Sequence, residues 1–296
     1  MTVRELLAAT TKSLQNDNAR FEARQLVMFA AGTDDLSWLI MHGGDEVADD
    51  VRKQCTEYVS RRNSGEPLYY IIGKTEFYSL PFYVGTGVLS PRQDTETLVD
   101  EAVRIANYMR GTASSGTASS GDAGGEADGK LRVLDLCAGS GCIGIALAKT
   151  LDNISVDAVE LYDEAYSYLE RNVKLNGCDN VHPIKADALG FCGEYDIVVS
   201  NPPYVRLDER NILSKEVLSE PETALFADDN GLCYYKIITE NMKDSCSALI
   251  FEIGETQGRE VCGILRSHGF HNVKTIKDLC GNDRVVCGFS KKYTVK

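Results

Sequence analysis

The sequence lacks an apolar run that approaches the roughly 20 residues of a membrane-spanning helix. The apolar stretch at residues 6–9 is too short for the core of a secretory signal. The ten cysteines include no Cys-x-x-Cys pair and no nearby histidines at zinc spacing. We therefore expect a cytoplasmic protein with reduced thiols, without a metal site and without membrane association.

Positive charge is also scarce. Lys and Arg number 31 against 44 Asp and Glu, which gives a net charge of −13. Contacts to phosphates need a basic surface, so this balance weighs against stable nucleic-acid binding, although a locally basic groove would not be excluded by it.

With 296 residues, 43% hydrophobic and 25% charged, the chain is long enough for one large domain or two ordinary ones. We expect a monomer.

The first part of the chain, residues 1–66, has the pattern of a small helical domain. Thr2 and Glu5 form a capping box, and apolar residues then recur at helical spacing in four successive segments. No catalytic candidate lies in this part, which favours a substrate-docking role. Aromatic and β-branched residues from Leu68 to Val84, broken by Gly73 and residues 79–81, indicate a β-hairpin within a linker at residues 67–90.

Residues 91–296 alternate between predicted strands and helices. A helix is expected from about residue 94 to 109, and a Gly/Ser-rich stretch at residues 110–129 is predicted to be a flexible surface insert. Strands follow at 131–136, 156–159, 181–184, 196–200 and 248–253, and near residues 273 and 285, with helices between most of them. Such alternation predicts an α/β fold with a doubly wound, mostly parallel sheet.

A glycine-rich loop follows the strand at 131–136. Gly139, Gly141 and Gly144 match G-x-G-x-x-G, and Glu160 ends the next strand, where a carboxylate can accept hydrogen bonds from ribose hydroxyls. This pattern fits a dinucleotide or another adenosine-containing cofactor. Asp135 could orient the loop or an ammonium group. Asp187 follows the third strand. It could recognise an adenine amino group, or it could be a solvated acid of a loop.

The motif Asn201-Pro202-Pro203-Tyr204 follows the strand at 196–200. Two prolines fix the backbone and remove two donors, so the loop is rigid and rich in acceptors, as a planar NH2 group requires. The alternative is an ordinary proline turn with a packing tyrosine. Because the motif would face a cofactor bound on the first central strand, and that strand begins as late as residue 131, S-adenosyl-L-methionine is favoured over NAD.

Residues 135–141 together with 201–204 resemble the class I amino-methyltransferases that use S-adenosyl-L-methionine. The resemblance extends to the HemK/PrmC family, the protein-(glutamine-N5) methyltransferases of peptide chain release factors. The further matching segments are Glu66-Pro67-Leu68, Glu76-Phe77 with Leu80-Pro81-Phe82, residues 90–96, Glu220-Pro221 with Ala224-Leu225, residues 251–254 with Gln257-Gly258, and residues 283–286. The match runs from about residue 65 to the end, and the helical domain agrees only in length and character. Glu160 stands where the family usually has Asp, and the insert is atypical.

The resemblance implies a seven-stranded methyltransferase domain and a set of cofactor contacts. The implied contacts are Asp135, Cys137, Ala138, Gly139, Ser140, Gly141, Glu160, Asp187, Ala188 and Asn201. It also implies that residues 201–204 grip the glutamine of the release factor's Gly-Gly-Gln motif. The sequence suggests no structural role for Arg92 or Gln93. Arg92 is therefore a candidate for substrate binding.

A mechanism follows from this implied substrate. The Asn201 oxygen and the Pro202 carbonyl accept the two N–H bonds of the glutamine amide, Pro203 stiffens the loop, and Tyr204 packs on the amide face. These acceptors strengthen as positive charge grows on the nitrogen. No general base is assigned, because the proton becomes acidic only after methyl transfer.

Three other activities remain as alternatives. A DNA adenine-N6 methyltransferase would use the same acceptors but needs a basic duplex-binding surface. A ribosomal-protein glutamine methyltransferase fits residues 90–96 less well than the release-factor branch does. An NAD-dependent oxidoreductase would bind NADH and ignore S-adenosyl-L-methionine.

Overall fold

The computed structural model of the chain describes residues 1–115 and 130–293. It divides into two compact units. The helical unit comprises Met1–Lys74 and Leu213–Ser219, and the α/β unit comprises Thr75–Ile212 and Glu220–Lys296. The helical unit thus takes in a return segment from the second half of the chain, which no sequence pattern indicated.

Five helices of the amino-terminal segment build most of the helical unit: α1 (Val3–Ser13), α2 (Ala19–Ala30), α3 (Leu36–Met41), α4 (Asp49–Asn63) and α5 (Leu68–Ile72). The capping box is present as expected, with the Thr2 hydroxyl accepting from the Glu5 backbone and the Glu5 carboxylate accepting from the Thr2 backbone. The apolar residues at helical spacing, among them Leu6 and Leu26, are buried between the helices. The prediction of an amino-terminal helical domain is therefore confirmed.

Helix α5 corrects the expected hairpin, which was predicted to begin at Leu68. Only β1 (Lys74–Phe77) and β2 (Leu80–Tyr83) form strands of a hairpin. Pro67 starts the helix with a φ of −58°, Gly73 ends it with a φ of +78°, and Leu68 and Ile71 are both buried. The flanking Pro and Gly, with burial at i and i+3, outweighed the strand-like composition.

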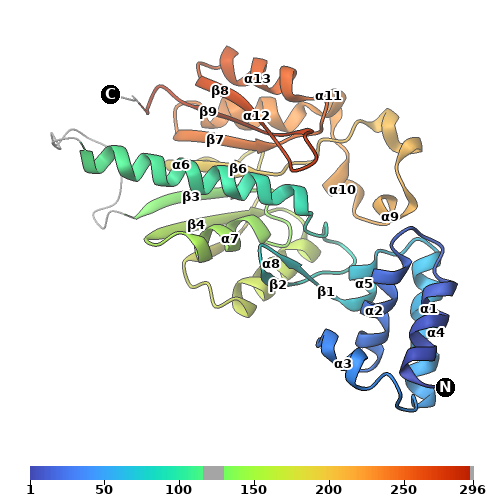
Figure 1. Cartoon of the computed structure of the whole chain (residues 1–296). Coiled ribbons are helices and arrows are strands. Elements are labelled where there is room, and N and C mark those ends of the chain that lie inside the picture. The colour runs from blue at the N-terminus through green and yellow to red at the C-terminus, as the bar shows by residue number, and fades with distance from the viewer. Residues whose placement is uncertain (116–129, 294–296) are drawn as a thin grey trace. The chain divides into compact units, whose positions relative to one another are not determined.

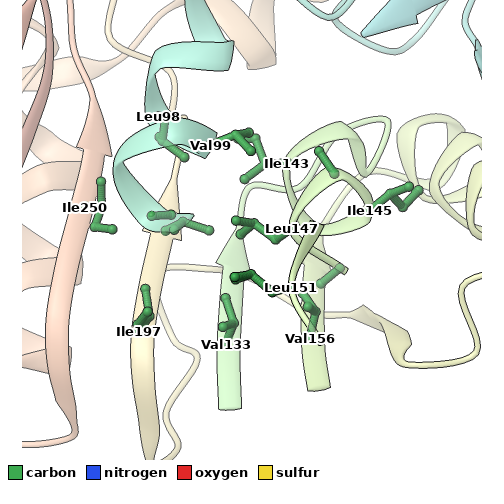
Figure 2. Packing of buried hydrophobic residues seen from close by; sticks show 14 of the residues in the cluster. Leu98, Val99, Val133, Ile143, Ile145, Leu147, Leu151, Val156, Ile197 and Ile250 are labelled. Atoms are coloured by element: carbon green, nitrogen blue, oxygen red, sulfur yellow. The ribbon is translucent and has the colours of Figure 1, made fainter. Parts of the chain in front are cut away.

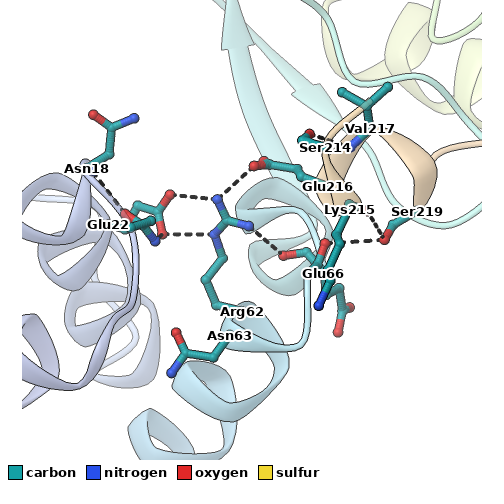
Figure 3. A network of polar contacts seen from close by, with 12 residues as sticks. Asn18, Glu22, Arg62, Asn63, Glu66, Ser214, Lys215, Glu216, Val217 and Ser219 are labelled. Carbon is teal, nitrogen blue, oxygen red and sulfur yellow. Dashed lines mark hydrogen bonds and ion pairs between the residues drawn. The ribbon is translucent and has the colours of Figure 1, made fainter. Parts of the chain in front are cut away.

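Arg62 of α4 holds the return segment within the helical unit (Figure 3). Its guanidinium donates to both carboxylate oxygens of Glu22, at 2.8 and 2.9 Å, and to Glu216 of helix α9 (Lys215–Leu218) at 2.8 Å. Arg62 and Glu22 are nearly buried, with 10% and 6% of their side chains exposed, whereas 37% of the Glu216 side chain is exposed. Arg62 therefore connects α9 to a buried ion pair of this unit through a partly solvated contact.

The α/β unit contains a seven-stranded sheet, as the resemblance implied. Its strands are β3 (Leu131–Leu136), β4 (Ile154–Glu160), β5 (Val181–Lys185), β6 (Tyr195–Ser200), β7 (Cys246–Glu252), β8 (His271–Lys277) and β9 (Asp283–Phe289). The order is β5-β4-β3-β6-β7-β9-β8 (Figure 1). Strands β3 to β7 are parallel, and only β9 runs antiparallel to its two neighbours.

The longer helices of this unit are α6 (Glu96–Ser115), α7 (Cys142–Thr150), α8 (Asp163–Leu175), α12 (Cys233–Met242) and α13 (Gly258–Ser267). Short turns η1 (Gln93–Thr95), η2 (Leu207–Ile212), α10 (Glu222–Leu225) and α11 (Asp228–Gly231) complete it. Helix α6 continues past the expected end at residue 109, so the first residues of the predicted insert are helical. Its remaining residues, 116–129, lie outside the described part of the chain.

Alternating residues of the central strands face the two helical layers. Val133, Ile197 and Ile250 pack with α6 and α7, for example with Leu98 and Leu147 (Figure 2). Their sequence neighbours Leu134, Val198 and Leu249 pack on the opposite face with α12 and α13. Because both faces are covered, these strands are almost continuously apolar, which is why they stood out in the sequence.

Strand β3 is the point at which the strand order reverses. Strands β4 and β5 lie on one side of β3, and β6 lies on the other. Leu136 is in register with Ser200, and the Ser200 hydroxyl donates to the Leu136 carbonyl at 2.7 Å. The loops that follow β3 and β6 therefore leave the sheet next to each other, at the edge where open α/β sheets bind ligands.

Candidate functional site

A cleft with an empty volume of about 870 Å³ lies at this edge of the α/β unit. Nine of the predicted site residues line it together with Arg92: Cys137, Ala138, Gly139, Ser140, Glu160, Asp187, Ala188, Asn201 and Pro203. Tyr162, Tyr234 and Thr95 also line it, and the sequence analysis had assigned none of these three to the site. The fold thus brings the glycine-rich loop and the Asn-Pro-Pro-Tyr loop to one cavity.

Glycine is required in the loop after β3 for two separate reasons. Gly139 has a φ of +56°, and a Cβ built on it would meet no atom within 4 Å, so its backbone faces open space. At Gly141, with a φ of +80°, a Cβ would overlap the Leu169 side chain. The first glycine leaves the backbone accessible to a ligand, and the second lets α7 begin close to α8.

Asp135 holds the first turn of α7, directly after this loop. Its side chain is fully buried, and Oδ2 accepts a hydrogen bond from the Gly144 backbone at 2.9 Å. Burial raises the pKa of Asp135 to about 7, although the Gly144 hydrogen bond acts in the opposite direction. The second oxygen, Oδ1, has no hydrogen-bond partner among the described residues. Asp135 is not among the residues lining the cleft, and its one side-chain hydrogen bond among the described residues goes to Gly144.

Glu160 links the glycine-rich loop to the start of α8. Oε2 accepts from the Gly139 backbone and Oε1 accepts from the Tyr162 backbone, each at 2.8 Å. A carboxylate oxygen has two lone pairs, so each atom keeps capacity for a further donor such as a hydroxyl. Glu160 therefore combines the shaping of the loop with an acceptor pair on the cleft wall.

Asp187 and Ala188, which follow β5, also line the cleft. Asp187 is exposed, and its Oδ1 accepts from the Leu189 backbone at 2.9 Å, which forms a tight turn after β5. Ala188 is buried beside it. Asp187 thus forms the turn after β5 and lines the cleft.

The Asn-Pro-Pro-Tyr loop is held by several contacts. Asn201 Nδ2 donates to Thr95 Oγ1 at 3.5 Å. The Tyr204 carbonyl accepts from Gln257 Nε2 at 3.1 Å, and the Tyr204 hydroxyl donates to Glu252 Oε1 at 3.4 Å. Asn201 and Pro203 line the cleft, whereas Pro202 and Tyr204 are outside its lining. Burial raises the pKa of Tyr204, so its hydroxyl stays protonated.

Glu252 and Gln257 back this loop, and sequence reasoning gave neither a role. Glu252 ends β7 with 2% exposure, and burial raises its pKa to about 7 while hydrogen bonding by Thr95 and the charge of Arg284 lower it. Gln257 Oε1 accepts from the Gly254 backbone at 2.9 Å. The signal was present in the segments 251–254 and 257–258 that matched the family, but motif spacing alone did not connect them with residue 204.

Arg92 has a structural partner after all. Its guanidinium pairs with the buried carboxylate of Glu220, which also accepts from the Ser90 backbone at 3.0 Å. Because Glu220 is separated from this segment by 128 residues, the sequence offered no sign of the pair. Arg92 therefore fixes the loop that forms one wall of the cleft, and it also lines that cleft.

A doubly wound sheet with a glycine-rich loop and an Asn-Pro-Pro-Tyr loop on adjacent strands defines a class I methyltransferase. Two family models match the chain, "PrmC N-terminal domain" over residues 5–73 and "Methyltransferase small domain" over residues 126–231. The first extends the likeness to the helical domain, where the sequence agreed only in general character. In fold, the chain is similar to the "hMettl16 catalytic domain in complex with MAT2A 3'UTR hairpin 6", with a TM-score of 0.54, 17% identity and 83% of each chain covered.

Curated relatives define the family more closely. The release factor glutamine methyltransferase of Flavobacterium psychrophilum is 38% identical, over 75% of this chain and 74% of its own. Those of Salmonella typhimurium and Haemophilus influenzae are 30% and 31% identical over 95% and 97% of both chains. This chain belongs to the release factor glutamine methyltransferase family. It is a methyltransferase, and its cofactor is S-adenosyl-L-methionine.

Proposed function

We propose that this enzyme methylates the N5 side-chain amide of a glutamine in a peptide chain release factor, within the Gly-Gly-Gln motif, and thereby modulates translation termination. The observation that carries the proposal is the single cleft shared by a cofactor-type loop after β3 and an acceptor loop after β6. The family to which the chain belongs supports the same substrate.

The cleft residues fit S-adenosyl-L-methionine. The open backbone at Gly139 provides a surface for close approach, and Glu160 offers spare lone pairs for a ribose diol. Asp187 and Ala188 also line the cleft, and in this proposal they contact the adenine ring. When bound, the cofactor supplies an electrophilic methyl group on a sulfonium.

Asn201 and Pro202 hold the nucleophile in this proposal. A glutamine nitrogen is weakly nucleophilic because its lone pair is delocalised into the carbonyl. The Asn201 Oδ1 and the Pro202 carbonyl accept its two N–H bonds and fix its position in a rigid loop. These acceptors gain strength as positive charge develops on the nitrogen, so they stabilise the transition state more than the ground state. Pro203 maintains the backbone. Tyr204, which the sequence analysis expected to pack on the amide face, lies outside the cleft lining, and we assign it the role of anchoring the loop through Glu252 instead.

Replacing Glu160 tests the cofactor half of the site. We expect Glu160→Ala to raise the dissociation constant for S-adenosyl-L-methionine about 10- to 100-fold, because hydrogen bonds to a charged group are worth about 1.5–3 kcal/mol. Titration calorimetry measures the constant directly. Glu170→Ala, which removes the same charge from an exposed position on α8, is the matched control and should bind normally. An unchanged constant in Glu160→Ala would rule out the ribose contact.

Mass spectrometry of a Gly-Gly-Gln-containing release factor tests the whole proposal. After incubation with enzyme and cofactor, the peptide with this motif should gain one methyl group on its glutamine. A release factor with Gln replaced by Ala in the motif is the control. Methylation of plasmid DNA, or of a ribosomal protein in place of the release factor, would overturn the substrate assignment.

The helical unit is proposed to dock the release factor, the enzyme to act as a monomer in the cytoplasm, and the partner to be protein, with no stable nucleic-acid binding. The net charge of −13 supports a protein partner. No helix in the described part of the chain combines the length and apolarity needed to cross a bilayer.

A further inference from the structure

We propose that Asn172 of α8 is a positioning residue for cofactor binding, because its side-chain amide ties the glycine-rich loop to strand β2. The amide bonds to the backbone of Ser140 in that loop and to the backbone of Tyr83 in β2. All three residues belong to the α/β unit, in which β2 packs against α8 (Figure 1). The inference deepens the proposed function and rests on it, since the amide affects the reaction only if the glycine-rich loop binds S-adenosyl-L-methionine.

The Asn172 side chain is fully buried, and its three hydrogen bonds all go to backbone atoms. Oδ1 accepts from the Tyr83 N–H at 2.7 Å, and Nδ2 donates to the Tyr83 carbonyl at 3.0 Å. Nδ2 also donates to the Ser140 carbonyl at 2.9 Å. Both N–H groups of the amide are therefore used, one on each of the two segments.

The partners of this amide fix its orientation. A backbone N–H can only donate and a backbone carbonyl can only accept, so Oδ1 must face the Tyr83 N–H. An inverted amide would place its NH2 group against that N–H and its oxygen against two carbonyls. Such an arrangement would leave buried polar groups unpaired, which is costly. Asn172 therefore holds the two segments in one defined relation.

Both segments lead into the lining of the cleft. Ser140 itself lines the cleft, and so do residues 87–92, which follow β2 after it ends at Tyr83. The chain after β2 stays close to α8, because a Cβ at Gly87 would overlap the Glu164 side chain. Helix α8 thus supports two lining segments of the cleft, and Asn172 supplies the polar contact that joins them.

The contact to Ser140 complements the contact that Glu160 makes in the same loop. Glu160 accepts from the Gly139 N–H, and Asn172 donates to the carbonyl of the next residue. The backbone of Gly139, which we propose to lie against the cofactor, is therefore held from two directions. Without Asn172, the peptide unit between Ser140 and Gly141 would lose a restraint that glycine itself does not supply.

Calorimetry on an Asn172→Asp variant tests this role by measuring the dissociation constant for S-adenosyl-L-methionine. Aspartate keeps the size of the side chain and an acceptor for the Tyr83 N–H, but it cannot donate to both carbonyls. The dissociation constant should rise about 10-fold, the lower end of the losses seen when groups that orient metal ligands are replaced. At saturating cofactor, kcat for release-factor methylation should stay within a few-fold of the wild type, because the Asn-Pro-Pro-Tyr loop is unchanged.

Asn176→Asp is the matched control on the same helix. Asn176 is also buried, and its Nδ2 joins α8 to the hairpin by donating to the Pro81 carbonyl at 2.9 Å. None of its hydrogen bonds among the described residues reaches the glycine-rich loop. This variant should therefore bind the cofactor normally even where its unfolding free energy is reduced. An unchanged constant in Asn172→Asp, or an equal rise in Asn176→Asp, would refute the role of Asn172.

The Glu160→Ala variant separates this failure from a failure of the proposed function. If Glu160→Ala and Asn172→Asp both bind S-adenosyl-L-methionine as the wild type does, the glycine-rich loop is not the cofactor site and both proposals are wrong. If only Glu160→Ala binds weakly, the cofactor site is correct and the positioning role of Asn172 is wrong.

Hydrogen exchange on the wild-type enzyme tests the same connection without a variant, so it is decisive even if Asn172→Asp does not fold. Binding of S-adenosyl-L-methionine should slow exchange several-fold in residues 80–83 of β2, although none of them lines the cleft. The reason is that the Tyr83 N–H is bonded to Asn172. Strand β8 is the reference, because it lies at an edge of the large sheet and contributes no residue to the cleft. Unchanged exchange in β2, or the same slowing in β8, would overturn the proposal.

Discussion

Asn201→Ala is expected to lower kcat about 10²- to 10³-fold, the range seen when one preorganised group that stabilises transition-state charge is removed. The Asn201 side chain lines the cleft beside the glycine-rich loop, and the loop that holds it follows the strand paired with β3. Alanine removes the acceptor while the two prolines keep the backbone rigid. The glutamine nitrogen then loses one of the two acceptors that hold it during methyl transfer.

The cofactor should bind this variant only modestly more weakly, because Glu160 and the glycine-rich loop are unchanged. Methyl transfer to a release factor under saturating cofactor gives kcat, and calorimetry gives the dissociation constant. Retained methylation would remove the role proposed for Asn201. A loss of cofactor binding as large as the loss of kcat would instead make Asn201 a cofactor residue alone.

The elements that carry the site were predictable because their physical signals are local. Strand β3 was predicted with its observed limits, and β6 differed by one residue, since buried parallel strands are unbroken apolar runs. The glycines after β3 and the prolines after β6 mark two loops. In each loop, one or two residues are enough to indicate the backbone conformation. Adjacency of the two loops then followed from the doubly wound topology.

The supports of the site were not predictable because they depend on contacts distant in the sequence. Glu220 forms an ion pair with Arg92, 128 residues away in the sequence. Glu252 accepts a hydrogen bond from the Tyr204 hydroxyl, 48 residues away. A buried carboxylate of this kind has no local signature, since Glu in a sequence is most often exposed. Helix α5 was missed for a different reason, because its aromatic and β-branched residues have strand propensity that the flanking Pro and Gly overrode.

Gly231→Ala is expected to lower kcat about 100-fold although Gly231 does not line the cleft. Gly231 ends the short helix α11 with a φ of +79°. A Cβ there would overlap the carbonyl oxygen of Tyr204 and would lie 2.8 Å from Gln257 Nε2. The methyl group would therefore displace the last residue of the Asn-Pro-Pro-Tyr loop and break the hydrogen bond from Gln257 to the Tyr204 carbonyl. A shift of about 1 Å in the groups that position a substrate is enough for a loss of this size.

Gly281→Ala separates this displacement from simple backbone strain. Gly281 has a φ of +88°, and a Cβ built there meets nothing within 4 Å, so the variant carries a similar conformational penalty without the overlap. Both variants should lose about 1 kcal/mol or more of unfolding free energy, because alanine tolerates positive φ poorly. Only Gly231→Ala should lose kcat while keeping its affinity for S-adenosyl-L-methionine, as kinetic and calorimetric measurements on the two proteins would establish. Equal kcat values in the two variants would mean that the position of the Tyr204 carbonyl does not control methyl transfer.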